Sequence, residues 1–283
     1  MSLRSPLHFK EQLDEAAAFF RDRRTLQGVL ARRLLNAHAP GDPELTDHLI
    51  RERRRQSGMD GSIGGSLVLT ARAVWEMMDL GANPDDAGIV RLTGFLLTRQ
   101  NQPGRWSDDG SAGDGFFSPG PRSRAIAPLL FPSGTVFEDE DDARFVASCL
   151  ALRAVLRAGH EDRAPVKTHL DRLLALKTID PHLAFVVVGA LGTGPPSYQA
   201  RIAPLIEATA KHQREDGTWP GVTVFHAVDL LLSVPSAAAR ALVRQAAPYI
   251  AGLQTPSGAF DPTESEAIAL IALRALDTSR TLA

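Results

Sequence analysis

Cysteine is almost absent from this chain, which has one such residue, Cys149, among 283. A single thiol forms no disulfide within the chain and cannot build a cysteine-rich zinc site. Cys149 also stands inside an apolar run, where a small buried core residue is the expected role. The sequence therefore excludes a disulfide scaffold and gives no sign of a structural metal.

Long hydrophobic runs are also lacking. The longest, Phe145–Val155 and Leu183–Leu191, are too short to cross a bilayer as a helix. The segment Met1–Phe20 carries charges and has no continuous apolar centre of the kind found in a secretory signal peptide. We therefore expect a cytoplasmic protein without an integral membrane segment.

Neither sign of charge is in surplus. The chain has 31 Lys and Arg against 33 Asp and Glu, a formal net charge of -2. Arginines do gather at Arg51, Arg53, Arg54 and Arg55, but acidic neighbours accompany them in a helical stretch, which favours a solvated helix face. Nucleic-acid binding, which needs a basic surplus on one face, is not expected.

Four segments of the chain share one pattern. In each, an amphipathic helix is followed by a glutamine, a short turn containing glycine, and then an aromatic or large apolar residue. The glycine supplies a turn in which positive φ is needed, and the glutamine amide is expected to tie one helix end to the next backbone segment. The copies run from Gln56 to Ile63, from Arg91 to Trp106, from Gln213 to Trp219 and from Tyr249 to Phe260.

Two kinds of helix alternate along the chain. One kind is apolar on nearly every side and must be enclosed by other elements, whereas the other is charged on one face. This alternation predicts an all-α protein with an inner and an outer layer of helices. The predicted inner helices are Ser66–Leu80, Phe145–Leu156, Leu183–Leu191, Val222–Val234 and Ile268–Leu276, and the outer ones include Pro84–Thr98, Val166–Leu176 and Ala237–Leu253, with Phe9–Leu35 supplying further helices.

The repeats resemble the QW motif of the terpene cyclase and squalene–hopene cyclase superfamily, (K/R)-x3-(F/Y/W)-L-x3-Q-x3-G-x-W. The resemblance implies an α/α toroid, a double-layered helical barrel of about six helical hairpins that is also used by prenyltransferases. We expect residues 41–283 to form the barrel and residues 1–40 to form a helical segment packed on it. In the second copy the matching residues are Arg91, Phe95, Leu96, Gln100, Gly104 and Trp106.

A second element is similar to the DxDD motif of class II terpene cyclases. Asp139-Glu140-Asp141-Asp142 precedes the apolar stretch Ala143–Ala158. In that family the motif opens an inner helix, and its middle aspartic acid protonates an alkene or epoxide. The resemblance implies that Asp141 is the acid and that Asp139 and Asp142 are its supporting carboxylates.

The residue types suit this chemistry. Crowded carboxylates cannot all ionise, so one of them retains a proton. The carbocation that follows protonation needs a dry cavity lined by aromatic faces, which attract a cation without reacting with it. The candidate lining residues are Trp106, Phe116, Phe117, Phe137, Trp219, Phe225 and Phe260.

Several of these residues have a plainer interpretation. Asp139 as N-cap, with the next three acidic residues in the first turn, would simply complement the helix dipole. Arg144, where the family pattern has Thr-Ala after the motif, could pair with Asp141 and favour its ionised form. The aromatics that end the repeats, Trp106, Trp219 and Phe260, are expected to be wedges between helices.

The remaining candidates lie in predicted inner helices and in a long loop. His182 and His226 are either hydrogen-bonded core residues or donors to the acidic cluster. The Gly-, Ser- and Pro-rich loop Ser107–Val136 is expected to cover the barrel mouth near Asp141. Asp108 and Asp109 in this loop are solvated, or bind magnesium if the substrate carries a diphosphate; otherwise no metal or cofactor is expected.

Two classes of function remain open. The first is protonation-initiated cyclisation of a polyprenyl substrate. The second is a non-catalytic barrel that binds an apolar ligand or a partner protein, or a subunit completed by a second barrel or a second copy. A protein prenyltransferase is disfavoured because Cys149 lacks the Asp-x-Cys turn of its zinc site, and a glycan enzyme is disfavoured by the apolar inner helices. Substrate length, a diphosphate group and the oligomeric state are left open.

Overall fold

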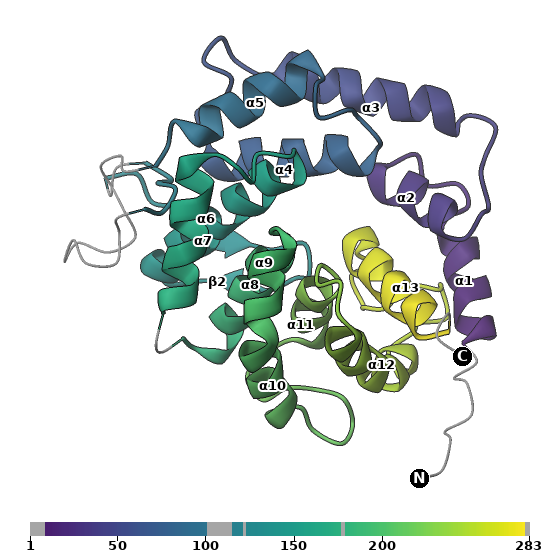
Figure 1. The fold of residues 1–283 in the computed structure, drawn as a ribbon. Helices are drawn as coiled ribbons and strands as arrows, with labels where there is room; N and C mark the ends of the chain where they lie inside the picture. The colour runs from purple at the N-terminus through teal and green to yellow at the C-terminus, as the bar shows by residue number, and fades with distance from the viewer. Residues whose placement is uncertain (1–8, 101–114, 121–122, 177–178, 281–283) are drawn as a thin grey trace. The chain divides into compact units, whose positions relative to one another are not determined.

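The computed structural model describes residues 9–100, 115–120, 123–176 and 179–280. These residues are mostly helical, with helices α1 to α13 and one short hairpin (Figure 1). The all-α class expected from the sequence is therefore confirmed. The chain packs as two compact units, which we call the terminal unit (residues 1–45, 131–135 and 205–283) and the middle unit (46–130 and 136–204).

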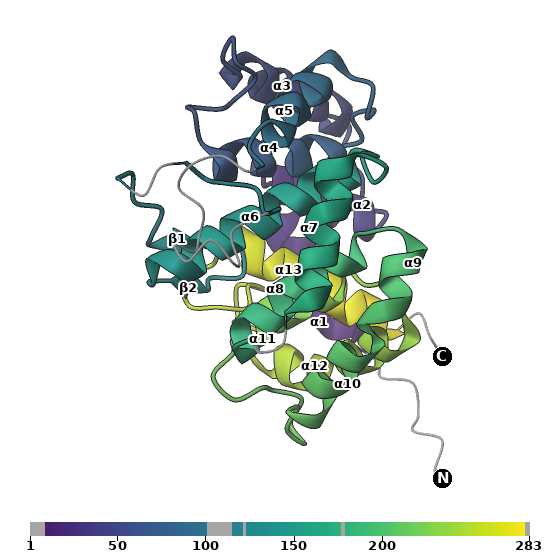
Figure 2. The same ribbon diagram turned by 60° about the vertical axis from the view of Figure 1, so that its left-hand side comes forward.

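The middle unit is built around α6. This helix is buried along almost its whole length, as its apolar circumference predicts, and packs against α4, α5, α7 and α8. The hairpin strand β2 lies beside α6 (Figure 2). The elements are α3 (Asp42–Gln56, which starts in the terminal unit), α4 (Leu67–Asp79), α5 (Ala87–Leu97), β1 (Leu129–Leu130), β2 (Val136–Phe137), α6 (Glu140–Arg157), α7 (Ala164–Ala175), α8 (Pro181–Gly192), α9 (Pro196–Gln199) and a 3-10 turn (Ala200–Ile202).

The terminal unit surrounds α13, which packs against α1, α2, α11 and α12. The unit joins helices from both ends of the chain, so α1 and α2 belong with the last helices. The expected boundary near residue 40 stays a prediction. The elements are α1 (Lys10–Phe20), α2 (Leu26–Leu34), α10 (Ala203–Lys211), α11 (Val224–Leu231), α12 (Ala237–Gly252) and α13 (Glu266–Arg280).

A buried arginine fixes the first helices of the terminal unit. The Arg32 guanidinium donates to the Asp42 carboxylate, with Nε 3.0 Å from Oδ2, and to the carbonyl oxygens of Phe20 (2.7 Å) and Arg23 (3.0 Å). These carbonyls belong to the last residue of α1 and to a residue shortly after it, where helix hydrogen bonding leaves them without intrahelical partners. Because its charge is neutralised by Asp42, Arg32 holds the α1–α2 corner against the start of α3.

Every predicted helical range overlaps an observed helix. The hairpin was not predicted, because two-residue strands have no detectable alternation. Leu129 pairs with Phe137 and Leu130 with Val136 in antiparallel register. The long loop thus ends in a small piece of regular structure directly before α6.

The glutamine turn has a common geometry. In the third copy, Gln213 Nε2 donates to the carbonyl of Gly217 and to that of Leu242 on α12, both at 3.0 Å. Gly217 has φ of 86°, and a Cβ there would lie 2.3 Å from the Gln245 carbonyl oxygen. The glutamine therefore ties its own turn to the next charged helix, and the glycine allows the two backbones to touch.

The fourth copy repeats this geometry. Gln254 Nε2 donates to the Gly258 carbonyl at 3.4 Å and to that of Gln12 on α1 at 2.9 Å. A Cβ on Gly258 would lie 2.4 Å from the Glu15 carbonyl oxygen. The last turn of the chain is thus fastened to its first helix.

The second copy closes at a different glycine from the one that the motif match selected. Gln100 Nε2 donates to the Gly115 carbonyl and, on α7, to that of Pro165, both at 2.6 Å. Phe117 therefore holds the place, two residues after the glycine, that Trp219 and Phe260 hold in the other copies. The predicted closing residues Gly104 and Trp106 lie outside the described residues.

In the first copy, the turn is displaced by one residue relative to the alignment in which Gln56 is the repeat glutamine. The Gly58 amide donates to the Ser62 carbonyl at 2.7 Å, as the Arg214 amide does to Thr218 at 2.8 Å. By this register Ser57, rather than Gln56, occupies the glutamine position. Gln56 is exposed and donates to Glu52.

The geometry of the third glutamine turn predicts that alanine substitution affects stability differently at two glycines. Gly217→Ala should lower the free energy of unfolding by about 2 kcal/mol or more, because the methyl group meets the Gln245 carbonyl and positive φ strains alanine. Gly252→Ala, at the end of α12 with nothing within 4 Å of its Cβ position, is the matched control. It should leave stability unchanged or raise it by up to about 1 kcal/mol. Urea unfolding measures both, and equal effects would contradict the close-approach role.

Candidate active site

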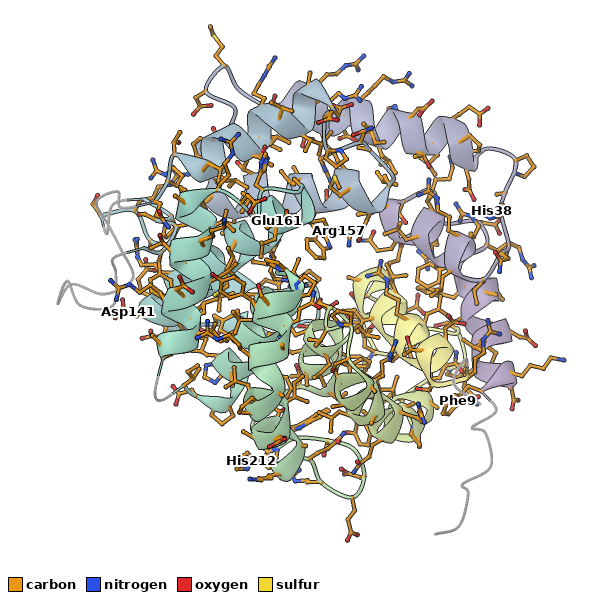
Figure 3. All side chains as sticks on the ribbon, viewed as in Figure 1. Phe9, His38, Asp141, Arg157, Glu161 and His212 are labelled. Atoms are coloured by element: carbon orange, nitrogen blue, oxygen red, sulfur yellow. The ribbon has the colours of Figure 1, made fainter. Side chains whose placement is uncertain are left out.

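The acidic motif forms the first turn of α6. Asp139 is the N-cap, and its Oδ1 accepts hydrogen bonds from the amides of Asp141 (2.9 Å) and Asp142 (3.0 Å). These two amides would otherwise lack partners at the helix start. Asp139 is therefore the N-cap that the plainer interpretation of the sequence predicted. Asp139 and Asp141 are both exposed, and Asp141 is labelled in Figure 3.

Glu140, the variable residue of the motif, is held from two sides. Its Oε2 accepts from the amides of Ile126 and Ala127, both at 2.9 Å, and its Oε1 accepts from Arg144 Nε at 2.6 Å. Burial works to raise the pKa of this carboxyl, but the two amides and the Arg144 guanidinium outweigh it and hold the pKa below its ordinary value. Glu140 is thus an anion with a structural partner on each side.

Arg144 is fully buried on α6. Beyond Glu140, its guanidinium donates from Nη1 to the Gly120 carbonyl and from Nη2 to the Arg124 carbonyl, both at 2.9 Å. A buried guanidinium is tolerated only when its donors meet acceptors, and these carbonyls supply them. The sequence allowed a pair between Arg144 and Asp141. In the structure, the Arg144 guanidinium donates to the Glu140 carboxylate, which lies one helical turn earlier on α6.

Asp142 meets a histidine from another helix. His182, in the first turn of α8, has Nε2 3.1 Å from Asp142 Oδ2. The Phe137 ring of β2 lies 5.8 Å from the His182 ring, centroid to centroid. The start of α6, the start of α8 and the hairpin thus bring together Asp142, His182 and Phe137, all of which the sequence singled out.

Phe116 and Phe117 are buried in the middle unit, not exposed in a loop. Their rings lie 4.7 Å and 5.2 Å from the ring of His169 on α7, and Phe116 also faces Phe145 of α6. Both are therefore packing residues in this structure. Burial lowers the pKa of His169 to about 3, and neither ring nitrogen has a hydrogen-bond partner.

The other predicted site residues that the structure describes belong to the terminal unit. Trp219 is buried, and its Nε1 donates to the Thr209 carbonyl at 2.9 Å, which fits a wedge. His226 is buried on α11, with Nδ1 3.4 Å from Ser133 Oγ. Phe225 and Phe260 are also buried. Trp106, Asp108 and Asp109 lie outside the described residues.

Sequence reasoning did not predict the contacts of Glu140 and Arg144. Their i,i+4 spacing on one helix was a usable signal, since such residues are neighbours. The carbonyl partners were not predictable, because they come from a segment without regular pattern. Cys149 is buried, and burial raises its thiol pKa, as expected for an inert core residue.

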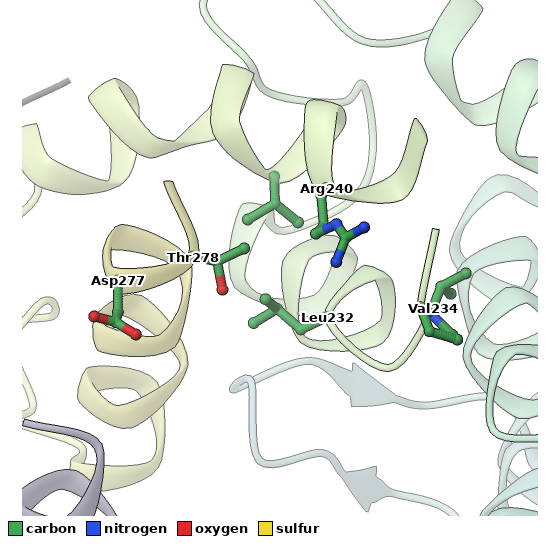
Figure 4. Close-up of a pocket in the computed structure, with 7 residues that line it drawn as sticks. Leu232, Val234, Arg240, Asp277 and Thr278 are labelled. Atoms are coloured by element: carbon green, nitrogen blue, oxygen red, sulfur yellow. The ribbon is translucent and has the colours of Figure 1, made fainter. Parts of the chain in front are cut away.

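One open pocket of about 310 Å³ lies in the terminal unit, between the ends of α11 and α13 and the start of α12 (Figure 4). No predicted site residue lines it. Asp277 at its edge is held by Arg280, whose Nε lies 2.8 Å from the carboxylate. The lining residues are Leu232, Val234, Pro235, Arg240, Val243, Asp277 and Thr278.

Within the described part of the chain, no three or more His, Cys, Asp or Glu side chains are grouped so as to hold a metal ion. The same residues include no helix of the length and apolarity that a membrane span requires.

Comparison with known proteins gives a result at the level of the fold. No protein-family model and no curated protein sequence matches the chain. A variant of the type II terpene cyclase MstE from Scytonema, solved in complex with its substrate geranylgeranyl dihydroxybenzoate, matches with a TM-score of 0.62 at 13% identity, over 96% of this chain and 97% of that chain. The same enzyme without ligand gives 0.59 at 13% identity over 94% and 97%, and a protein from Actinoplanes gives 0.53 at 14% identity over 95% and 98%. The chain therefore has the helical fold of these proteins.

The buried histidine predicts an acid-sensitive fold. Unfolded imidazole titrates near pH 6.5, whereas His169 in the folded protein titrates at about 3. Between these values only the unfolded chain binds the proton, so the free energy of unfolding should fall by up to about 1.4 kcal/mol per pH unit below about pH 6.5. His169→Phe should remove this contribution. Urea unfolding between about pH 7 and pH 5 tests it, and an unchanged slope in the variant would assign the acid sensitivity to other groups.

Proposed function

We propose that this protein is a class II terpene cyclase-type enzyme that cyclises a polyprenyl substrate by proton transfer from Asp141. The observation that supports this most is the arrangement of the DxDD-like motif. It opens an enclosed helix in a chain whose fold matches a type II terpene cyclase over nearly the full length of both chains. The motif match supplies the residue roles, and the fold supplies the frame around them.

The carboxylates of the DxDD-like motif have different contacts. Asp139 caps the helix through two amides, Glu140 is held by two amides and Arg144, and Asp142 is within hydrogen-bond distance of His182. These are interactions that favour or balance negative charge. The DxDD match assigns the proton donor by its position in the motif, and that position is Asp141.

The proposed reaction is an isomerisation and needs no co-reactant. The Asp141 proton forms a new C–H bond at one alkene carbon of the substrate, and the other carbon becomes a tertiary carbocation. Further alkenes attack in turn, each forming a carbon–carbon bond, until the last cation loses a proton. Asp141 is then reprotonated, and no metal takes part in these steps.

The MstE comparison bears on the alternative of a subunit completed by a second barrel. This chain aligns with 97% of that chain. That enzyme, solved with its substrate, has a chain of about the same extent as this one, so the proposal is made without a second barrel within the chain. A polyprenyl group, of unspecified length and head group, is the substrate class we propose.

The exposure of the Asp141 side chain favours the alternative, a non-catalytic protein that binds an apolar ligand or a partner. In that case Asp139 and its neighbours would serve the helix dipole alone. The two proposals differ in whether Asp141 is needed for turnover.

A turnover assay distinguishes the cyclase from the non-catalytic binding protein. The purified protein is incubated with farnesyl diphosphate, geranylgeranyl diphosphate, squalene and a geranylgeranyl-substituted aromatic acid, and products are resolved by chromatography and mass spectrometry. Asp141→Asn should reduce the rate of cyclisation at least about 100-fold, since it removes the general acid. Asp162→Asn, an exposed carboxylate before α7, is the matched control and should retain full activity.

Either of two results would count against the cyclase. One is an unchanged rate in Asp141→Asn, and the other is the absence of product in folded wild-type protein with every substrate class. Folding is checked for each variant by thermal unfolding, so that a loss of rate is not a loss of protein.

A further inference from the structure

We propose that the open pocket of the terminal unit binds a small organic anion, with Arg240 and Arg244 binding its acidic head group and the apolar wall of the pocket contacting a short hydrocarbon body. The inference goes beyond the proposed function and does not depend on it. Every residue that lines the pocket belongs to the terminal unit, whereas the acidic motif belongs to the middle unit. The observations behind it are the cavity, the charges beside it and one buried donor.

The pocket lies where α11 and α13 end and α12 begins (Figure 4). Its volume of about 310 Å³ is at the lower end of the range of small-molecule sites. An apolar wall of this kind gains from contact with a hydrocarbon group, because both are then removed from water. The apolar lining residues are Leu232, Val234, Pro235 and Val243.

The charge of the pocket is positive. Its charged lining residues are Arg240 and Asp277, and the Asp277 carboxylate already accepts from Arg280 Nε at 2.8 Å. Among the residues that the structure describes, the Arg240 side chain has neither a hydrogen-bond partner nor an ion-pair partner. Its guanidinium stands among the other lining side chains (Figure 4). The pocket therefore offers a cationic donor to a ligand.

A second arginine stands beside the first. Arg244 follows Arg240 by four residues on α12, a spacing at which side chains are neighbours on one helix face. Its Nε is buried and has no hydrogen-bond partner within the described part of the chain. A buried donor that has lost water without gaining an acceptor costs stability. An anion bound next to Arg240 would supply that acceptor.

The places of the two cations on α12 are unfavourable without a ligand. The helix carries these two arginines and no acidic residue, so neither charge is balanced along its own helix. Arg240 is its fourth residue, close to the positive end of the helix dipole, and like charges at i,i+4 repel. A bound anion offsets both costs, whereas solvation of a surface gives no reason for this arrangement.

These features select the class of ligand. A guanidinium binds carboxylate and phosphate groups through paired hydrogen bonds, and two of them favour an acidic head group over a neutral one. The apolar wall favours a hydrocarbon body next to that head group, and the volume limits the body to a short one. A carboxylate and a phosphate monoester present the same chemistry to the two arginines, so the experiment includes both.

The test measures binding of hexanoate and of hexyl phosphate to the full-length protein, with ¹³C-labelled leucine and valine methyl groups as probes. At least one of these anions should shift the methyl signals of Leu232 and Val234 in a saturable way. Hexanol and hexylammonium should not, because they lack the anionic head group. Inorganic phosphate, which lacks the hydrocarbon body, should bind at least about 10-fold more weakly than hexyl phosphate.

Substitution of the arginines separates a binding site from a solvated surface. Arg240→Gln and Arg244→Gln should each raise the Kd of the anion about 10-fold or more, since each removes a charge-assisted hydrogen bond. Arg21→Gln, which alters an exposed arginine of the same unit outside the pocket, is the matched control and should leave the Kd unchanged. Without ligand, Arg240→Gln should be at least as stable to urea as the wild type, because the like-charge pair is gone.

Three results would overturn the site. They are no saturable shift with either anion, equal binding of hexanol and the anions, and an unchanged Kd in both arginine variants. Inorganic phosphate that binds as tightly as hexyl phosphate would overturn the contact with a hydrocarbon body. If Arg244→Gln does not fold, Arg240→Gln still decides, because that side chain is exposed. The assay needs no turnover, so its result is independent of the cyclase proposal.

Discussion

The approach of a turn glycine to the backbone of a neighbouring helix is the constraint on which the helical packing depends. At Gly217 and Gly258 the positive φ and the nearby carbonyl leave no room for a side chain. A glutamine then satisfies the carbonyl of each glycine and one from the neighbouring helix. Because the amide has two donors, one side chain joins two backbones. The alternation of enclosed and half-exposed helices follows from repeating this junction.

In the middle unit the same junction leads to the acidic turn. Gln100 closes on Gly115, Phe117 packs inward, and the chain then runs to the carbonyls that Arg144 binds. The segment before α6 is thus held at one end by the repeat and at the other by the Glu140–Arg144 pair. Near α6, four backbone groups of this irregular stretch meet a polar side chain, namely the carbonyls of Gly120 and Arg124 and the amides of Ile126 and Ala127.

The helices were predictable from the sequence because enclosed and amphipathic helices have characteristic patterns of apolar residues. The register of the glutamine turns was not predictable in this way. A motif match favoured Gly104 and Trp106, whereas the hydrogen bond from Gln100 selects Gly115, and the motif spacing carries no signal for this later glycine. At the site, the cap role of Asp139 and the approach of a histidine could be foreseen from residue type. The partners of Arg144 could not, because they are backbone carbonyls and carry no sequence signature.

Capping and acid catalysis are compatible in one acidic turn because different residues can perform them. A helix start needs one N-cap side chain, and Asp139 satisfies both amides that it reaches. The dipole does not require three further carboxylates, and like charges so close together repel one another. Glu140 has compensating partners and Asp142 has His182. The two amides that Asp139 reaches are satisfied without the Asp141 side chain, so the proposed acid role of Asp141 does not compete with capping of the helix.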